Sequence, residues 1–177
     1  MAEKENVVLF KTGDAVVHPV RGAGVITGFK EFTSNGRETR YYKIKLFDAA
    51  QTRLMIPIEQ AEERGLRLAT PRSDLEEVWD VLEEDPNTLA KNHRTRYKKI
   101  EDKLQTGDIL QVAEAVRDIS WRRRNEDSLT VKGRRLYKRA MRLLAGEIAA
   151  SQGIDLETAQ DKIRTRLRDS FEDVDEE

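Results

Sequence analysis

The chain has 177 residues, of which 38% are hydrophobic and 37% are charged, and its formal net charge is −1. This limited apolar content favours two small domains over one large core. The absence of cysteine excludes disulfides and thiolate metal sites. No apolar run approaches the roughly 20 residues that span a bilayer, and the first residues lack the apolar stretch of a signal peptide. We therefore expect a cytoplasmic protein without a membrane segment.

The near-neutral total conceals a basic middle. Residues 1–90 carry a net charge of −4, residues 91–142 carry +9 and residues 143–177 carry −6. The segment 91–99, KNHRTRYKK, holds six basic groups when its histidine is counted, and no acid. A basic region between acidic flanks is typical of a surface that binds a polyanion. The alternative is a set of solvated helix faces whose charges pair along each helix.

Residues 1–70 are predicted to form a small β domain. Apolar and polar residues alternate there, and glycine, proline and asparagine interrupt the pattern at short intervals. We expect strands at 15–18, 24–32, 40–47 and 53–58, with a candidate fifth strand at 7–10. The Asn35-Gly36 pair favours a left-handed turn between the second and third of these strands. Short strands joined by glycine turns are typical of an SH3- or Tudor-like barrel.

The strand at 53–58 carries a first candidate binding site. Pro57 has no N–H group for a sheet ladder, so this strand is expected at an edge of the sheet. An exposed edge can pair with a strand of a partner protein. Alternation predicts that Leu54 and Ile56 fill the barrel while Met55 points outward. Met55 is therefore the sharper candidate for contact with a partner, since methionine side chains adapt to varied surfaces.

Residues 71–177 are predicted to form about five helices, because apolar residues recur there with a period near 3.6. Ser73 and Glu76 have the spacing of a capping box for a first helix over 74–84. A second helix is expected over about 90–104. The expected caps of the third, fourth and fifth helices are Asp108, Thr130 and Asp155. The fold class is thus α+β, with a small barrel followed by a helical bundle.

Basic residues gather on three of the predicted helices. Along the second helix these are Arg94, Arg96, Lys98 and Lys99. Arg122, Arg123 and Arg124 end the third helix, where the helix dipole alone can explain them. The start of the fourth helix carries Arg134, Arg135, Lys138 and Arg139. Cations at a helix start oppose the dipole, so this last group is the stronger evidence for an anionic partner.

The residue types that usually perform catalysis are sparse. The chain has two histidines, His18 and His93, far apart in the sequence, and no cysteine. These residues give no credible metal cluster. The sequence shows no phosphate loop, dinucleotide fingerprint or nucleophile elbow. We therefore predict a protein that is not an enzyme, with no catalytic residue, no bound metal and no cofactor.

Several segments together resemble a known family. FKTGDAVVHPVRGAGVITG, followed by MIP at 55–57 and GLR at 65–67, resembles the N-terminal domain of the CarD/CdnL family of bacterial transcription regulators. RYKKIEDKLQTGDILQVAEAVRDISWRR resembles the start of the helical C-terminal domain of that family. The resemblance covers roughly residues 9–168. The Gly-Asp barrel opening alone is less specific, because the polymerase-binding module of transcription-repair coupling factors shares it.

This resemblance implies two partners. The Tudor-like domain, residues 1–70, would bind a lobe of the RNA polymerase β subunit, and the helical domain, residues 71–177, would contact promoter DNA at the upstream edge of the bubble with little sequence preference. The protein, expected to be a monomer, would stabilise the open complex. By position, the polymerase contact comprises Arg53, Leu54, Met55, Ile56 and Pro57. The DNA contact comprises His93, Arg94, Arg96, Lys98, Lys99, Arg134, Arg135 and Lys138.

The chain departs from the family pattern at two positions. Many members carry a tryptophan that wedges into the upstream fork, and its position here is His93. Trp79 cannot replace it, because its place on an apolar stripe predicts a core residue. Family members often have an acid three residues after the cap of the fourth helix, where this chain has Gly133.

Two other classes of function fit the same residues. An adaptor could join two proteins through its barrel and present its basic helices to an acidic partner instead of DNA. An RNA-associated factor is the other class, but such proteins expose aromatic residues for stacking, and Tyr41-Tyr42 is the only adjacent aromatic pair. Dependence on promoter DNA separates the three functions, because an adaptor is indifferent to DNA and an RNA binder prefers single strands.

Overall fold

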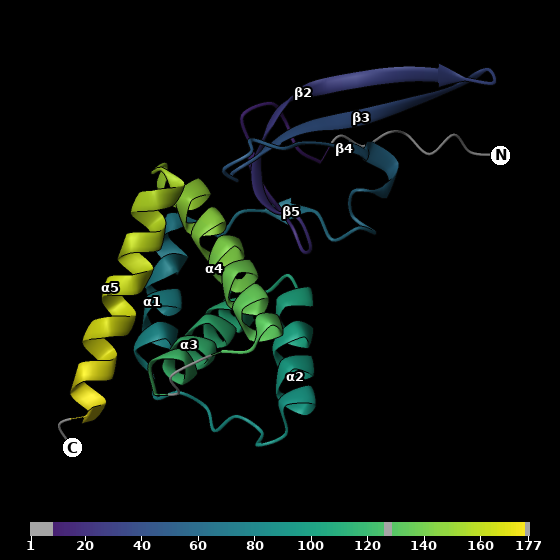
Figure 1. Ribbon diagram of the computed structural model, residues 1–177. Helices are drawn as coiled ribbons and strands as arrows, with labels where there is room; N and C mark the ends of the chain where they lie inside the picture. The colour runs from purple at the N-terminus through teal and green to yellow at the C-terminus, as the bar shows by residue number, and fades with distance from the viewer. Residues whose placement is uncertain (1–8, 126–128, 176–177) are drawn as a thin grey trace.

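The computed structural model describes residues 9–125 and 129–175, and it consists of an antiparallel sheet followed by a helical bundle (Figure 1). The strands are β1 (Ala15–His18), β2 (Gly22–Ser34), β3 (Arg37–Leu46), β4 (Arg53–Pro57) and β5 (Arg67–Leu68). The helices are α1 (Leu75–Glu83), α2 (His93–Gln105), α3 (Ile109–Asn125), α4 (Val131–Gln152) and α5 (Leu156–Asp175). The predicted fold class is confirmed.

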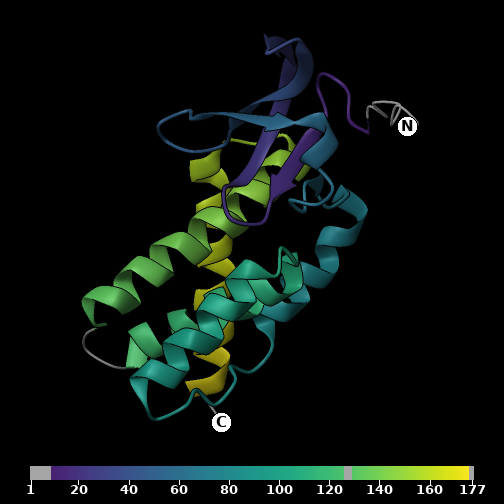
Figure 2. The same cartoon turned by 90° about the vertical axis from the view of Figure 1, so that its right-hand side faces the viewer.

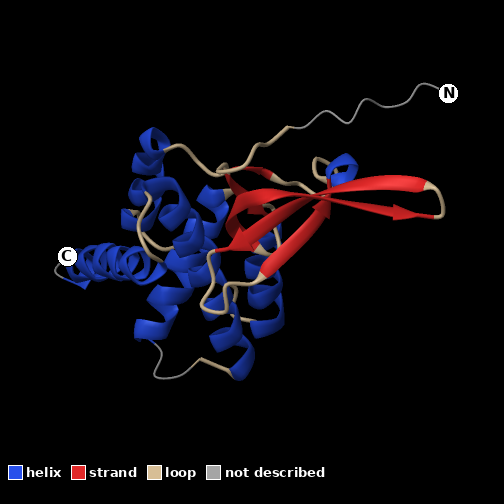
Figure 3. Ribbon diagram, turned by 90° about the horizontal axis from the view of Figure 1, so that it is seen from above, coloured by secondary structure: helices blue, strands red, loops and turns tan. Residues whose placement is uncertain are grey.

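The five strands lie in the order β4-β3-β2-β1-β5, so β4 is an edge strand as Pro57 predicted. Within the described residues the sheet stays open, because β4 and β5 do not pair with each other. A register shift between Ile26 and Gly28 interrupts the long β2–β3 ladder. Such a bulge increases the local twist. The tip of this hairpin extends away from the helices (Figures 1 and 3).

The inner face of the sheet has a core of its own. Alternate residues of neighbouring strands point into it, among them Ile26, Tyr42, Ile44 and Ile56, each at most 2% exposed. Phe10 packs against the edge of the Tyr42 ring, with ring centroids 5.6 Å apart. This cluster buries the apolar half of each alternating strand, which is why the pattern in the sequence predicted these strands well.

The fifth strand lies elsewhere than predicted. Part of the candidate strand at 7–10 is outside the described residues, and the remaining two residues are not in a strand. Their N–H groups instead donate to the Tyr42 hydroxyl, at 3.0 Å from Leu9 and 3.3 Å from Phe10. The fifth strand is β5, which pairs with β1 through only two residues. A strand this short gives no detectable alternation.

The starts of α3, α4 and α5 follow the predicted caps, whereas α2 begins at His93, after the expected start near residue 90. The expected cap oxygens of Asp108, Thr130 and Asp155 accept N–H groups from the first turns of α3, α4 and α5 at 2.8–3.1 Å. The capping box at Ser73 is wrong. Residues Arg72–Asp74 form a short 3₁₀ helix ahead of α1, and the Ser73 hydroxyl donates to Asp74 instead. The 3₁₀ turn supplies hydrogen-bond acceptors for the first N–H groups, which a side-chain cap would otherwise satisfy.

The helices enclose a second, larger core, and α4 joins it to the sheet. Leu82, Leu104, Leu144 and Ile163 from four helices are completely buried in this core. The C-terminal half of α4 lies against β2 (Figures 1 and 2). A Cβ atom on Gly146 would lie 3.8 Å from that of Ala23, an ordinary contact distance. The small residues on both sides therefore let helix and sheet approach closely.

Both tryptophans lie at the edge of the helical core. Trp79 packs against that core but stays partly exposed, with the Arg166 guanidinium 5.8 Å from its ring. Trp121 meets Phe171 edge-on, with ring centroids 5.0 Å apart. None of the described helices is both long and apolar enough to cross a membrane.

Candidate functional site

The edge strand β4 presents its residues in the predicted alternation. Ile56 is 1% exposed and Leu54 is half-buried, whereas Met55 is 38% exposed. Met55 lies opposite Lys43 of β3, on the outer face of the sheet. Pro57 ends the strand opposite Tyr41. The other side of β4 has no partner strand among the described residues, so its backbone is available for pairing.

A groove of about 460 Å³ runs beside Met55 on this outer face. Its cationic lining residues come from three strands and are Lys30, Lys43, Lys45 and Arg53. Lys45 lies opposite Arg53 in the β3–β4 register, which places these two cations side by side at one end. An apolar side chain ringed by cations complements a partner that offers an apolar residue among carboxylates.

The same outer face continues toward the hairpin tip through two aromatic residues. Phe32 is 44% exposed and meets Tyr41 edge-on, with ring centroids 5.4 Å apart. Lys30 lies 4.9 Å from the centre of the Phe32 ring. The sequence pattern did not predict this extension. Alternation within β3 already placed Tyr41, Lys43 and Lys45 on one face, but their alignment with β4 depends on the register, which the sequence does not reveal.

The start of α2 carries exposed basic side chains. The helix begins at His93, after Asn92, whose side-chain oxygen accepts the N–H groups of Arg94 and Thr95 at 2.9 and 3.4 Å. His93 is exposed and lies edge-on to the Tyr97 ring at 6.3 Å. The exposed cations of this stretch are Lys91, Arg94, Lys98 and Lys99. Lys98 pairs with Asp102 on the helix surface at 3.3 Å, which is a weak interaction at such exposure.

Arg96 differs from its neighbours because it is buried, with 4% of its surface exposed. One guanidinium nitrogen donates to the carbonyl oxygens of Ala90 and Lys91 at 2.8 and 3.3 Å. The guanidinium also lies 5.4 Å from the centre of the Tyr97 ring. The side chain thus fastens the segment ahead of α2 to the helix, and it has little surface left for a phosphate.

The start of α4 lies against α2. The Tyr97 hydroxyl hydrogen-bonds the Thr130 hydroxyl, which also accepts the N–H of Gly133 at 3.1 Å. A Cβ atom at position 133 would lie 2.8 Å from the Tyr97 oxygen, so a larger residue would force the Tyr97 side chain to move. The departure from the family pattern at Gly133 therefore has a packing reason. Figure 1 shows the start of α4 beside α2, so the basic residues of the two helices lie on neighbouring elements.

Of the four cations predicted at the start of α4, three are exposed and Arg139 is half-buried. Arg134 donates from one nitrogen to the Leu129 carbonyl oxygen at 2.6 Å and keeps the rest of its guanidinium near the surface. Arg135 and Lys138 are also exposed. The Lys132 ammonium pairs with Glu101 of α2 at 3.1 Å. Because this ion pair bridges the two helices, it helps hold the basic surfaces of α2 and α4 together.

Comparison with known proteins gives matches to both parts of the chain. Residues 10–69 match the model of the CarD-like/TRCF RID domain, and residues 77–164 match the model of the CarD C-terminal domain. The chain is also similar to a Bacillus subtilis (strain 168) protein named "Putative transcription factor YdeB". The two are 28% identical over 146 residues, which is 82% of this chain and 94% of that protein. The chain therefore belongs to the CarD family, a family of transcription factors that are not enzymes.

Proposed function

We propose that this protein binds the β subunit of RNA polymerase through β4 and promoter DNA through the starts of α2 and α4, and so stabilises the open promoter complex. It acts in the cytoplasm as a monomer, with residues 1–70 and 71–177 as its two functional domains. The observation that carries the proposal is the open edge of β4, with exposed Met55 beside a cationic groove. The match to the RID domain model supports polymerase as the partner.

Strand pairing is the proposed mode of polymerase binding. The outer edge of β4 offers unpaired backbone groups between Arg53 and Pro57, and a partner strand can add to it. Met55 would enter an apolar depression of the partner, while Lys43 and Arg53 beside it would meet carboxylates. Leu54 and Ile56 act from the inner face, where they hold the strand in place.

The exposed cations of α2 and α4 are the proposed DNA contacts. Arg94, Lys98, Lys99, Arg135 and Lys138 would meet phosphates directly, and Arg134 would do so with its free donors. Such contacts give weak, salt-sensitive binding, with a Kd of roughly 10⁻⁴–10⁻⁶ M for duplex alone. Tethering to polymerase raises the effective DNA concentration enough for this affinity to matter.

Arg96 and His93 take different roles in this proposal. Arg96 positions the DNA-facing segment through its bonds to Ala90 and Lys91, without touching a phosphate itself. His93 is exposed at the first residue of α2, where it can stack on a base at the fork. An imidazole covers less area than an indole, so we expect a weaker wedge than tryptophan would form.

A binding assay with RNA polymerase tests the first contact. Met55→Glu places a carboxylate on the cationic edge and removes the apolar anchor, so we expect at least about a tenfold loss of affinity for polymerase. Leu68→Glu is the matched control, because Leu68 is 56% exposed on β5, the opposite edge strand. Equal loss in both variants, or no loss at Met55, would contradict the proposed interface.

A further inference from the structure

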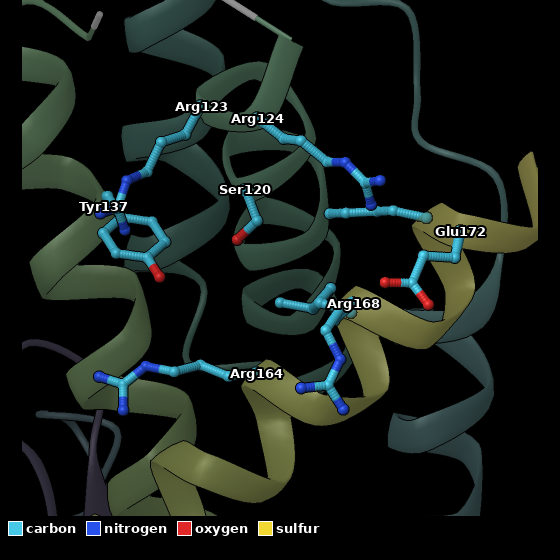
Figure 4. A pocket seen from close by; sticks show the side chains of 9 residues that line it. Ser120, Arg123, Arg124, Tyr137, Arg164, Arg168 and Glu172 are labelled. Atoms are coloured by element: carbon cyan, nitrogen blue, oxygen red, sulfur yellow. The ribbon is translucent and has the colours of Figure 1, made fainter. Parts of the chain in front are cut away.

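A second concave site lies outside the proposed polymerase and DNA contacts. It is a cavity of about 350 Å³ between the C-terminal end of α3, the first half of α4 and the second half of α5 (Figure 4). Its lining includes four arginines, from α3 and α5: Arg123, Arg124, Arg164 and Arg168. Glu172 is the one carboxylate in the lining. A volume near this size is typical of sites for small ligands.

The arginines on α5 keep donors available for a ligand. Arg164 pairs with Asp161 at 3.0 Å and donates to Gln160 at 3.4 Å, and Arg168 pairs with Asp169 at 3.2 Å. The side chains of both ion pairs are more than half exposed. Ion pairs at such exposure contribute little, and each guanidinium has five N–H donors. A phosphate could therefore displace or share these contacts. Arginine is well suited to bind a phosphate, because the planar guanidinium group can donate to two phosphate oxygens at once.

The lining also contains two hydroxyl side chains, of Ser120 and Tyr137, and two apolar side chains, of Leu167 and Phe171. The buried Ser120 hydroxyl oxygen has no hydrogen-bond partner among the described residues, although buried polar atoms are normally satisfied. Figure 4 shows this oxygen facing the hollow from α3, with the Tyr137 ring on one side and Arg168 on the other. The Arg123 guanidinium lies over the Tyr137 ring, 4.8 Å from its centre. Hydroxyl donors beside guanidinium groups are a chemistry that recognises phosphate oxygens.

A second cavity of about 440 Å³ adjoins the first. Arg123, Tyr137 and Arg164 line both. The second cavity also includes Arg134 and Lys138, the proposed DNA contacts on α4. An occupant of the first cavity would thus lie one side chain away from the basic surface of α4.

We propose that this cavity binds a small organic anion with two or more phosphate groups, of the size of a nucleoside diphosphate or triphosphate. Arg123 on α3 and Arg164 and Arg168 on α5 can hold successive phosphates of one small molecule, whereas a duplex presents its phosphates on a convex surface. This inference does not depend on the proposed polymerase and promoter contacts.

Titration calorimetry of the full chain with ATP and with inorganic pyrophosphate, in 150 mM salt, tests the proposal. We expect saturable binding of one molecule per chain with a submillimolar Kd. The double variant Arg164→Gln/Arg168→Gln should weaken it at least tenfold. Arg166→Gln is the matched control, because Arg166 is on the same helix but bonds Glu83 and lies over Trp79. The affinity of the Arg166→Gln variant for both polyphosphates should equal that of the unmodified chain.

Amide chemical shifts recorded during a pyrophosphate titration give a test that needs no variant. The shifts should move first at Ser120, Arg123 and Tyr137. Absence of saturable binding to either polyphosphate, equal weakening by Arg166→Gln, or shifts centred on α2 would each overturn the proposal. If the double variant weakened binding of a 20-base-pair duplex and left both polyphosphates unaffected, the cavity would be a DNA contact instead.

Discussion

Arg67 of β5 and Glu147 of α4 form a bidentate ion pair across the junction of sheet and helices, with Nη1–Oε1 and Nη2–Oε2 distances of 2.6 and 2.9 Å. The Glu147 side chain is only 5% exposed and also accepts the N–H and hydroxyl of Thr70. Arg67 donates further to the Gly107 carbonyl oxygen at 2.7 Å. One arginine thus ties the last strand to α4 and to the loop before α3.

Arg67→Ala should destabilise the fold, because it leaves the buried Glu147 carboxylate without its cation. Breaking a fully buried pair costs about 3–5 kcal/mol, and Arg67 is 34% exposed, so we expect a smaller loss of about 2–3 kcal/mol. Urea unfolding measures it. Arg64→Ala serves as the control, because Arg64 is exposed and its guanidinium hydrogen-bonds the nearby Gln60, and it should change stability by less than about 0.5 kcal/mol. Similar losses at both positions would refute the role given to the pair.

Gly133→Ala should destabilise the protein although alanine favours helices. Its Cβ would lie 2.8 Å from the Tyr97 hydroxyl oxygen, and such overpacking costs about 1–3 kcal/mol. Gly146→Ala in the same helix meets nothing closer than 3.7 Å and should be neutral or stabilising by up to about 1 kcal/mol. Thermal unfolding of the two variants compares them directly. A stabilised Gly133→Ala protein would show that the α2–α4 contact is looser than described.

Arg96 and Arg94 are two residues apart on α2, but we expect substitution of the first to lower stability and substitution of the second to weaken DNA binding. Arg96→Ala leaves two carbonyl oxygens without their hydrogen-bond donor and removes a buried guanidinium. The free energy of unfolding should therefore fall by about 2 kcal/mol. Arg94→Ala should leave stability within about 0.5 kcal/mol. In a DNA-binding series at several salt concentrations, Arg94→Ala should reduce the salt slope by about one unit. If Arg96→Ala left stability unchanged, a direct DNA contact would be the better account of that residue.

His18 makes part of the stability of the sheet depend on pH. Burial, and then the charges of Arg21 and Arg64, lower its pKa below the usual 6.5. Its Nδ1 accepts the N–H groups of Val20 and Arg21 at 3.1 and 3.2 Å, which only the neutral ring can do. The unfolded chain therefore binds the proton more readily. The stabilisation is fully present above pH 6.5 and is lost as the pH falls through the lowered folded-state value.

Urea midpoints at pH 7.5 and 5.5 check this dependence. The unmodified chain should lose more stability between these two values than His18→Asn, whose side chain does not titrate. Carboxylates stay largely ionised over this interval, so their contribution is similar in the two proteins. Equal losses would show that His18 does not titrate as its surroundings indicate.

Sequence patterns predicted most elements because burial follows periodicity in both parts of the chain. Alternation over 53–57 correctly separated buried Ile56 from exposed Met55, and the caps at Thr130 and Asp155 are local chemistry. Arg96 could not be assigned in this way. The sequence does not distinguish it from the other cations of KNHRTRYKK. Its burial arises from the path of residues 90–91 around the helix start. Sites built across elements, such as the groove of β2, β3 and β4, likewise depend on register.

The lifetime of an open promoter complex after a heparin challenge tests the central claim most directly. With the cognate RNA polymerase, we expect the protein to lengthen this lifetime. Met55→Glu should abolish the effect through lost polymerase binding, and Arg134→Glu should reduce it while polymerase binding is retained. An unchanged lifetime with polymerase still bound would contradict the account and favour an adaptor function. Loss of polymerase binding in Arg134→Glu would contradict the separation into two contact surfaces.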